Sequence, residues 1–258
     1  MNIGIIGCGI VGGVIKKYIE TQTNHNLLLY DPGLELDDKM ETADIIFISV
    51  PVPTKGFKQD LSILKEAVEM CPYNVPVYIR SSVVPGTTDN LFEWYLENHN
   101  KYKPIYAMPE FLTERTCYDD FIKQKTHIIG KQVHQEHLEL LKKALPHKEF
   151  VEMKSAEAEF VKYSHNVFAA MKVSFFNGIY DLAQKENCDY EVIREWVPKV
   201  TGFISDKHLM VPGPDGKRGW GGKCFPPNLT ALIGYAGNDP FHLLLKDVFC
   251  LNTIHRNK

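Results

Sequence analysis

The 258-residue sequence lacks several features that would assign its class at once. None of the six cysteines forms a CxxC pair and the ten histidines include no HxxxH pair, so we expect neither a metal site nor a disulfide scaffold. No basic tract indicates a nucleic-acid partner. No apolar run approaches the roughly 20 residues that span a membrane, and the apolar N-terminal stretch has no basic flank typical of a secretory signal. These absences predict a protein of a reducing compartment, the cytoplasm, with no nucleic-acid or membrane partner.

The composition is that of an ordinary globular protein. Hydrophobic residues make up 44% of the chain and charged residues 24%, with a formal net charge of -3. The length allows one large domain or two modest ones. Because neither charge nor composition selects a function, the motifs have to do so.

The clearest motif lies at the N-terminus. An expected strand at residues 2–6 is followed by GCGIVG at 7–12, an expected helix to about residue 21, and a second strand at 26–30 that ends at Asp31. A strand, GxGxxG, a helix, a strand and an acid in this order form a dinucleotide-binding fingerprint. The alternative is a plain βαβ turn with a surface aspartate.

Each part of this fingerprint has a predicted role with a dinucleotide. Gly7, Gly9 and Gly12 permit a tight turn and a close approach of the backbone to a pyrophosphate at the helix N-terminus, where Ile10 and Val11 lie. The Asp31 carboxylate would accept hydrogen bonds from ribose hydroxyls and would repel a 2′-phosphate. The predicted cofactor is therefore NAD rather than NADP.

The alternation of strands and helices continues through about residue 150. Further strands are expected at 44–50, 75–80, 105–108 and 126–129, with helices at 61–70, 88–98 and 135–145. This pattern predicts a doubly wound, Rossmann-like α/β domain over residues 1–150, with ligands at the carboxyl ends of the strands. Val50, Pro51, Ser82 and Glu114 follow such ends, and we predict that they contact the cofactor.

The pattern changes near residue 153, and residues 151–258 are expected to form an all-helical second domain. A long helix is predicted from Ser155, a good N-cap residue, to about residue 186. Shorter helices are expected at 190–197, 229–236 and 240–254.

Three residues of this helical part have chemistry of interest. Cys224 follows a run of glycines and precedes two prolines, an arrangement that presents a thiol on a stiff, solvent-reachable loop. A thiolate nucleophile needs such a setting, although free cysteines are commonly buried core residues. Lys162 and Asn166 lie four residues apart on the long helix and could meet an anionic oxygen, although a solvated helix face is the commoner reading.

Two residues of the first domain also have an alternative reading. Glu114 could equally be an ordinary loop acid, and Ser82 could be a helix or turn cap.

A nicotinamide cofactor beside a nucleophilic cysteine predicts a four-electron oxidation. One hydride transfer converts a primary alcohol to an aldehyde, and addition of a thiolate gives a thiohemiacetal that can be oxidised to a thioester. Lys162 and Asn166 would stabilise the oxyanion, and Glu114 would place or deprotonate water.

Six segments in order make the chain resemble the UDP-glucose/GDP-mannose (nucleotide-sugar) 6-dehydrogenase family. They are GCGIVG (7–12), SVPVPT (49–54), RSSVVPGTT (80–88), PEFLTE (109–114), AEAEFVKYSHN (156–166) and PGPDGKRGWGGKCFPPN (212–228). The resemblance implies a nucleotide-sugar substrate, Cys224 as nucleophile and a homodimer formed through the long helix from Ser155. It also assigns Lys162, Asn166 and Glu114 to the oxyanion and water, and Ser82 to water binding. The substrate contacts that it implies include Glu110, Phe111, Leu112, Lys162, Asn166, Gly221 and Gly222.

The chain departs from the family in two ways. The family loop usually ends CFPKD, whereas this chain has CFPPN, so that Asn228 stands where an aspartate assists the lysine and the water. Loss of such an acid–base group costs about 10²–10⁴-fold in rate. The family also has a C-terminal nucleotide-binding domain that has no counterpart in this sequence.

Two alternatives to this dehydrogenase therefore stay open. One is a degenerate NAD-binding homologue or subunit that is non-catalytic or needs a partner domain. The other is a two-electron dehydrogenase of the 6-phosphogluconate or 3-hydroxyacid type, which requires no cysteine.

Overall fold

The structure is a computed structural model that describes residues 1–131 and 133–257 and divides into two compact units. The N-terminal unit comprises residues 1–53 and 59–162, and the C-terminal unit comprises residues 54–58 and the chain from residue 163 onward. Within the described residues, no helix is both long and apolar enough to cross a membrane.

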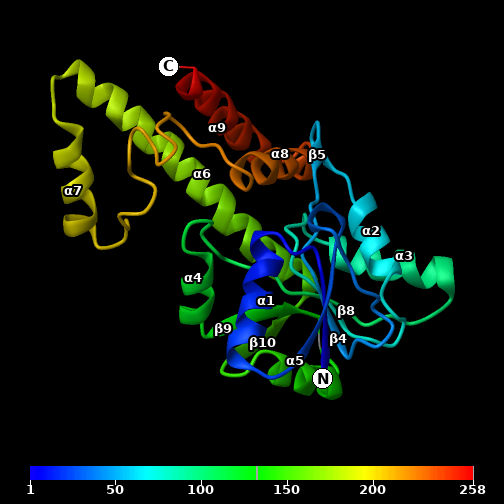
Figure 1. Ribbon diagram of the computed structural model, residues 1–258. Helices are drawn as coiled ribbons and strands as arrows, with labels where there is room; N and C mark the ends of the chain where they lie inside the picture. Colours follow the sequence, from blue (N-terminus) through cyan, green and yellow to red (C-terminus); the bar gives the residue numbers. More distant parts are fainter. Residues whose placement is uncertain (132, 258) are drawn as a thin grey trace. The chain divides into compact units, whose positions relative to one another are not determined.

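The N-terminal unit is built on one sheet (Figure 1). In the described residues this sheet has eight strands, in the order β10-β9-β8-β7-β4-β1-β2-β3. The strands are β1 (Asn2–Ile6), β2 (Asn26–Asp31), β3 (Leu36–Asp37), β4 (Ile45–Ile48), β7 (Val77–Ile79), β8 (Ile105–Ala107), β9 (Thr126–Gly130) and β10 (Glu149–Met153). Two short strands, β5 (Thr54–Lys55) and β6 (Lys58–Gln59), pair separately.

Strand direction is mixed at the two edges of this sheet. The central strands β2, β1, β4, β7 and β8 are parallel, as a Rossmann-like sheet requires. At the edges, β3 is antiparallel to β2, and β9 is antiparallel to β8 where Ala107 faces Gly130. Since β10 runs parallel to β9, both of these strands run against the centre. The predicted Rossmann-like α/β fold is confirmed, with this reversal added.

Helices cover both faces of the sheet, which explains the continuous apolar strands. In β4 all four residues are buried, and they alternate between two cores: Ile45 and Phe47 join one, Ile46 and Ile48 the other. The first core includes residues of α1, α4 and α5, and the second residues of α2 and α3, which lie on opposite sides in Figure 1. The bounds are α1 (Ile10–Gln22), η1 (Pro32–Leu34), α2 (Ser62–Glu69), α3 (Thr87–His99), α4 (Cys117–Lys123) and α5 (Gln135–Ala144).

The predicted helical second part is also present. Its helices are α6 (Ser155–Lys185), which begins in the N-terminal unit, α7 (Tyr190–Thr201), α8 (Phe225–Ala236) and α9 (Phe241–Arg256). Pro226 and Pro227 occupy the first turn of α8, where backbone N–H groups have no partner within the helix, so the prolines cost nothing there. They fix the start of α8 directly after Cys224.

Candidate active site

The glycine turn between β1 and α1 has the close backbone packing that the motif predicts. Gly7 has a positive φ of 86°, and a Cβ there would lie 2.6 Å from the Ser49 carbonyl oxygen. A Cβ on Gly12 would lie 1.9 Å from the Gly7 carbonyl oxygen. A Cβ on Gly9, by contrast, would meet no atom within 4 Å, so open space adjoins the start of α1.

Asp31 is held beside this turn at the end of β2. Its carboxylate accepts a hydrogen bond from the Cys8 backbone N–H at 2.7 Å and one from the Gly33 N–H at 3.0 Å. No side chain among the described residues caps α1, so the first N–H groups of α1, from Ile10 and Val11, have no such acceptor. The open space, these donors and the fixed carboxylate fit the pyrophosphate and ribose of NAD.

A second group of predicted residues lines a small pocket in the N-terminal unit. Ser82 and Lys162 line it together with Glu159. Lys162 is only 3% exposed, and its Nζ donates to Glu110 Oε1 at 3.0 Å. The other Glu110 oxygen accepts from the Leu112 N–H at 2.6 Å. Glu110, which the resemblance implied as a substrate contact, and Lys162 on the long helix therefore form a buried ion pair.

The other residues of the 109–114 segment lie differently. Phe111 places its ring centroid 5.6 Å from Lys162 Nζ. Glu114 is exposed in the turn that precedes α4 and is not among the residues that line the pocket. After β4, Val50 is buried and Pro51 is exposed. The catalytic and cofactor roles of these residues stay predictions.

Glu159 is a functional candidate that the sequence did not single out. Its buried carboxylate accepts hydrogen bonds from the Gly86 N–H at 2.6 Å, the Thr88 N–H at 2.9 Å and the Thr88 hydroxyl at 2.6 Å. Burial raises the pKa of Glu159 to about 7, against these hydrogen bonds, which lower it. It lies one helical turn before Lys162, and only tertiary contacts reveal it.

In the C-terminal unit, Cys224 is exposed at the N-cap position of α8. Asn228 lies one turn further along α8 and is buried, and its Oδ1 accepts a hydrogen bond from Asn166 Nδ2 at 2.5 Å. The Asn166 oxygen in turn lies 2.9 Å from His165 Nδ1. The structure thus brings Asn166 and Asn228 together in a buried amide pair.

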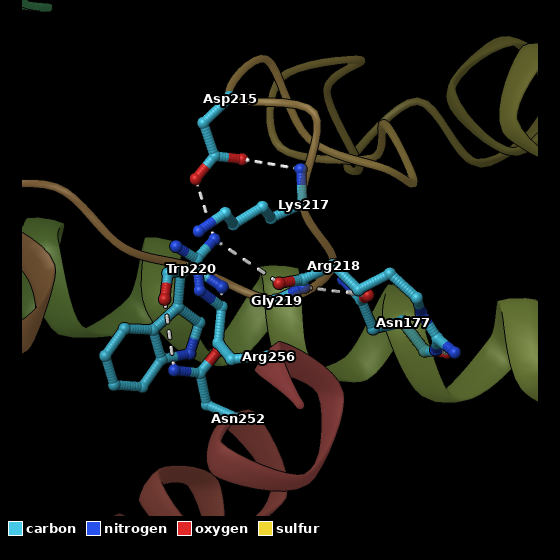
Figure 2. Close-up of polar contacts among 8 residues, drawn as sticks. All are labelled: Asn177, Asp215, Lys217, Arg218, Gly219, Trp220, Asn252 and Arg256. Carbon is cyan, nitrogen blue, oxygen red and sulfur yellow. Dashed lines mark hydrogen bonds and ion pairs between the residues drawn. The ribbon is translucent and has the colours of Figure 1, made fainter. Parts of the chain in front are cut away.

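Buried amides from two helices hold the glycine-rich loop before Cys224 (Figure 2). Asn252 on α9 accepts from the Trp220 N–H at 2.7 Å and donates to the Trp220 carbonyl at 3.0 Å. Asn177 on α6 accepts from the Gly219 N–H at 3.0 Å. A Cβ on Gly219 would lie 2.4 Å from Asn252 Oδ1, so this position requires glycine. These contacts fix the backbone four and five residues before the thiol.

Ion pairs complete the attachment of this loop. Arg256 Nη1 lies 2.7 Å from Asp215 Oδ2, and Arg218 Nη1 lies 2.7 Å from Asp181 Oδ1 (Figure 2 shows the first pair). A Cβ on Gly221 would lie 3.0 Å from Arg256 Nη2, whereas one on Gly222, with its φ of 80°, would meet nothing within 4 Å. The open space at Gly222 leaves room for a ligand next to the loop.

Sequence comparison assigns both parts of the chain. The NAD-binding domain of the UDP-glucose/GDP-mannose dehydrogenase family matches residues 32–147, and the central domain of that family matches residues 156–252. The chain belongs to this family. Residues 32–147 accordingly belong to the NAD-binding domain of this family.

Individual relatives agree with this dehydrogenase family. The UDP-glucose 6-dehydrogenase of Rickettsia conorii is 26% identical over 279 aligned residues, which cover 92% of this chain and 63% of that relative. A UDP-glucose dehydrogenase structure from Pyrobaculum islandicum has a TM-score of 0.82 at 23% identity and covers 98% of this chain and 68% of that one. The 3-hydroxyisobutyrate dehydrogenase of Mycobacterium tuberculosis has a TM-score of 0.70 at 11% identity, over 99% of this chain and 94% of that one. The likeness to each of these two solved structures is one of fold alone. The chain spans about 63% of the length of the curated relatives that it matches.

Proposed function

We propose that this chain oxidises the C6 hydroxyl of a nucleotide sugar of the UDP-glucose type to the carboxylate, through a covalent intermediate on Cys224. The observation that carries the proposal is an exposed thiol at the N-cap of α8, on a loop whose backbone is held by Asn177 and Asn252. The helix N-terminus favours a thiolate there. A dehydrogenase that stopped at a ketone or aldehyde would have no use for this arrangement.

The open glycine turn and Asp31 would hold NAD, with Val50 and Pro51 after the next strand as further predicted contacts. NAD supplies the hydride acceptor for each of the two oxidations. In the first, a basic group takes the hydroxyl proton of the sugar, and the product is the C6 aldehyde.

The protein residues then act on the aldehyde. The Cys224 sulfur adds to C6, and the carbonyl oxygen becomes an oxyanion that Lys162 Nζ and Asn166 Nδ2 are proposed to stabilise. Oxidation of this thiohemiacetal gives a thioester. Lys162 is suited to the role because it is buried, lies 3.0 Å from Glu110 Oε1 in an ion pair, and lines a pocket with Ser82.

Hydrolysis of the thioester needs a water molecule. The C–S bond breaks, the thiolate leaves, and the water oxygen becomes part of the carboxylate. Ser82 and Glu114 are the proposed water ligands, with Glu114 as the base. Asn228 offers an amide in place of the family's aspartate, so it can orient Asn166 but cannot accept a proton.

Intact-protein mass spectrometry tests this proposal. With NAD and UDP-glucose in excess, rapid quenching should trap the mass of an acyl group on Cys224, and the Cys224→Ser variant should lack it. Absence of the adduct at every time point, while sugar is oxidised, would rule out the covalent route.

The neutral Asn166–Asn228 pair favours one second candidate, a homologue that binds NAD but does not turn over by itself. Such a homologue would bind NAD tightly but would form no NADH from UDP-glucose. Co-purification with a separate nucleotide-binding chain would support this candidate.

A homodimer through α6 is part of the main proposal. Phe168, Phe175 and Leu182 recur every seven residues along α6 and are 67, 59 and 57% exposed. An apolar stripe with this spacing is typical of a helix that packs on another helix. No disulfide joins cysteines of the described residues, which fits the proposed reducing compartment, the cytoplasm.

A further inference from the structure

The guanidinium of Arg80, the first residue after β7, is buried and has no hydrogen-bond partner among the described residues. It is 1% exposed, and its Nε, Nη1 and Nη2 atoms make no hydrogen bond to any described residue. Its backbone is fixed, since the Arg80 N–H donates to the Ile48 carbonyl at 2.8 Å. A buried guanidinium with five unused donors is unfavourable, so an acceptor in another state of the protein is expected.

The aromatic and basic groups around Arg80 do not neutralise its charge. Its Cζ lies 5.7 Å from the Phe121 ring centroid, and Lys148 Nζ lies 4.7 Å from the same ring. Lys148 is already bonded to the carbonyls of Phe121 and Gln124. His127 is neutral, because burial, followed by the charges of Arg80 and Lys148, lowers its pKa to about 3. None of these groups neutralises Arg80.

Glu110 is the acid whose charge acts on Arg80. Burial lowers the pKa of Arg80 to about 10, and the Glu110 carboxylate opposes that shift. The two residues follow adjacent parallel strands, because β7 pairs with β8 and the Met108 N–H donates to the Ile79 carbonyl. Glu110, however, is occupied by Lys162 and by the Leu112 N–H. One buried carboxylate thus acts electrostatically on two buried cations but is hydrogen-bonded to only one of them, Lys162.

We propose that Arg80 is a positioning residue that takes over the Glu110 carboxylate when Lys162 turns to the substrate oxygen. The proposal rests on the function proposed above, in which Lys162 leaves Glu110 to stabilise an oxyanion. Without an exchange partner, that movement would leave a buried carboxylate with a single hydrogen bond, which is strongly unfavourable. Arg80 makes the movement possible, because its guanidinium is charged, buried and unused.

The exchange can be tested without substrate or NAD, by removing Lys162 permanently. In Lys162→Met, Glu110 should pair with Arg80, so the melting temperature should fall only moderately. In Arg80→Met/Lys162→Met, the loss should exceed the sum of the two single losses, and adding Glu110→Gln should restore most of it. Arg80→Lys/Lys162→Met should behave like Lys162→Met, because a cation is retained.

Two outcomes would overturn the exchange. Additive losses in the double variant would show that Arg80 and Lys162 do not share Glu110. Failure of Glu110→Gln to rescue the double variant, including a double variant that does not fold, would show that Arg80 is needed for packing alone.

Turnover gives a second, separate readout. Arg80→Met should lower kcat for UDP-glucose by roughly tenfold or more with little change in KM, and Arg80→Lys should recover much of it. In a Glu110→Gln background, Arg80→Met should have no further effect on kcat. A wild-type protein with no turnover would contradict the proposed function, while the melting-temperature cycle would still decide the exchange.

Discussion

At the scale of single residues, Asn228 stands where the resemblance to the family implies an aspartate. Its Oδ1 accepts the hydrogen bond from Asn166 Nδ2, as a carboxylate oxygen would. The orientation of Asn166 is thereby preserved. The missing property is proton acceptance, which matters for attack of water on a thioester rather than for formation of the thioester. The substitution should therefore affect the second half of the reaction.

Asn228→Asp is expected to speed release of the acyl group from Cys224. Aspartate keeps the acceptor for Asn166 and adds a base, and a positioned base contributes up to about 10²–10⁴-fold. Single-turnover decay of the Cys224 adduct measures the effect, with Asn24→Asp, on an exposed asparagine, as the charge-matched control. An unchanged decay rate would place the water away from Asn228.

At the scale of elements, α3 is capped by a residue of another helix. The carboxylate of Glu159, on α6, bonds to the N–H groups of Gly86 and Thr88, at the N-cap and second positions of α3. A carboxylate is favoured there by the helix dipole, yet burial favours its protonated form. The loop that carries Ser82 is tied to α6 by a titratable group.

Glu159 should make stability depend on pH in a predictable direction. Its folded-state pKa of about 7 lies above the ordinary 4.5, so the folded protein holds a proton that the unfolded chain has lost between these values. The free energy of unfolding should then fall as pH rises from about 4.5 to 7, by at most about 1.4 kcal/mol per pH unit. Urea unfolding of wild type and Glu159→Gln at pH 5 and pH 8 measures it, with Glu97→Gln as the exposed control. If the free energies of unfolding of wild type and Glu159→Gln differ by the same amount at pH 5 and pH 8, this prediction is wrong.

The attachment of the glycine-rich loop also predicts a variant effect. Asn252→Ala would leave the buried Trp220 N–H and C=O without partners, at a cost on the order of 1–3 kcal/mol for each group. Denaturant unfolding should show this loss, and the rate of Cys224 alkylation should change with it. Asn257→Ala, on an exposed residue just past α9, should alter neither. If Asn252→Ala is as stable as wild type, contacts other than those of Asn252 hold the glycine-rich loop.

The elements that could be predicted from the sequence are those with local signals. The fully apolar β4 and the glycine turn before α1 were predicted with nearly correct bounds. In contrast, β10 was missed because it is an edge strand with two glutamates, EFVEM, and α4 because it has only seven residues. The reversed direction of β9 and β10 depends on pairing between strands, which no local pattern encodes.

In the candidate site, too, the sequence predicts the reactive side chains but not the residues that hold them in place. Lys162, Glu110 and Cys224 could be proposed from motifs, because the chemistry of a side chain is visible in a sequence. Their supports could not: Asn252 recognises the backbone of Trp220 from 32 residues away, and Glu159 reaches α3 from 71 residues away. Buried asparagine and glutamate residues on helices carry no marker of such contacts.

At the scale of the whole molecule, the apolar stripe on α6 predicts the state of assembly. Phe175→Glu, at the middle of the stripe, should convert a dimer to a monomer, because a buried unpaired carboxylate is costly in a helix interface. Sedimentation velocity at micromolar concentration measures this change. The control is Lys185→Glu, at the end of α6 and outside the stripe, which should leave the dimer intact. If the wild-type protein sediments as a monomer under these conditions, the proposed homodimer is wrong.

The central claim is a four-electron oxidation through Cys224, and the NADH yield per sugar tests it most directly. Absorbance at 340 nm with limiting UDP-glucose should show two NADH per sugar in wild type and loss of the second NADH in Cys224→Ala. The same yield in Cys224→Ala as in wild type, or no NADH from any nucleotide sugar despite tight NAD binding, would contradict the claim.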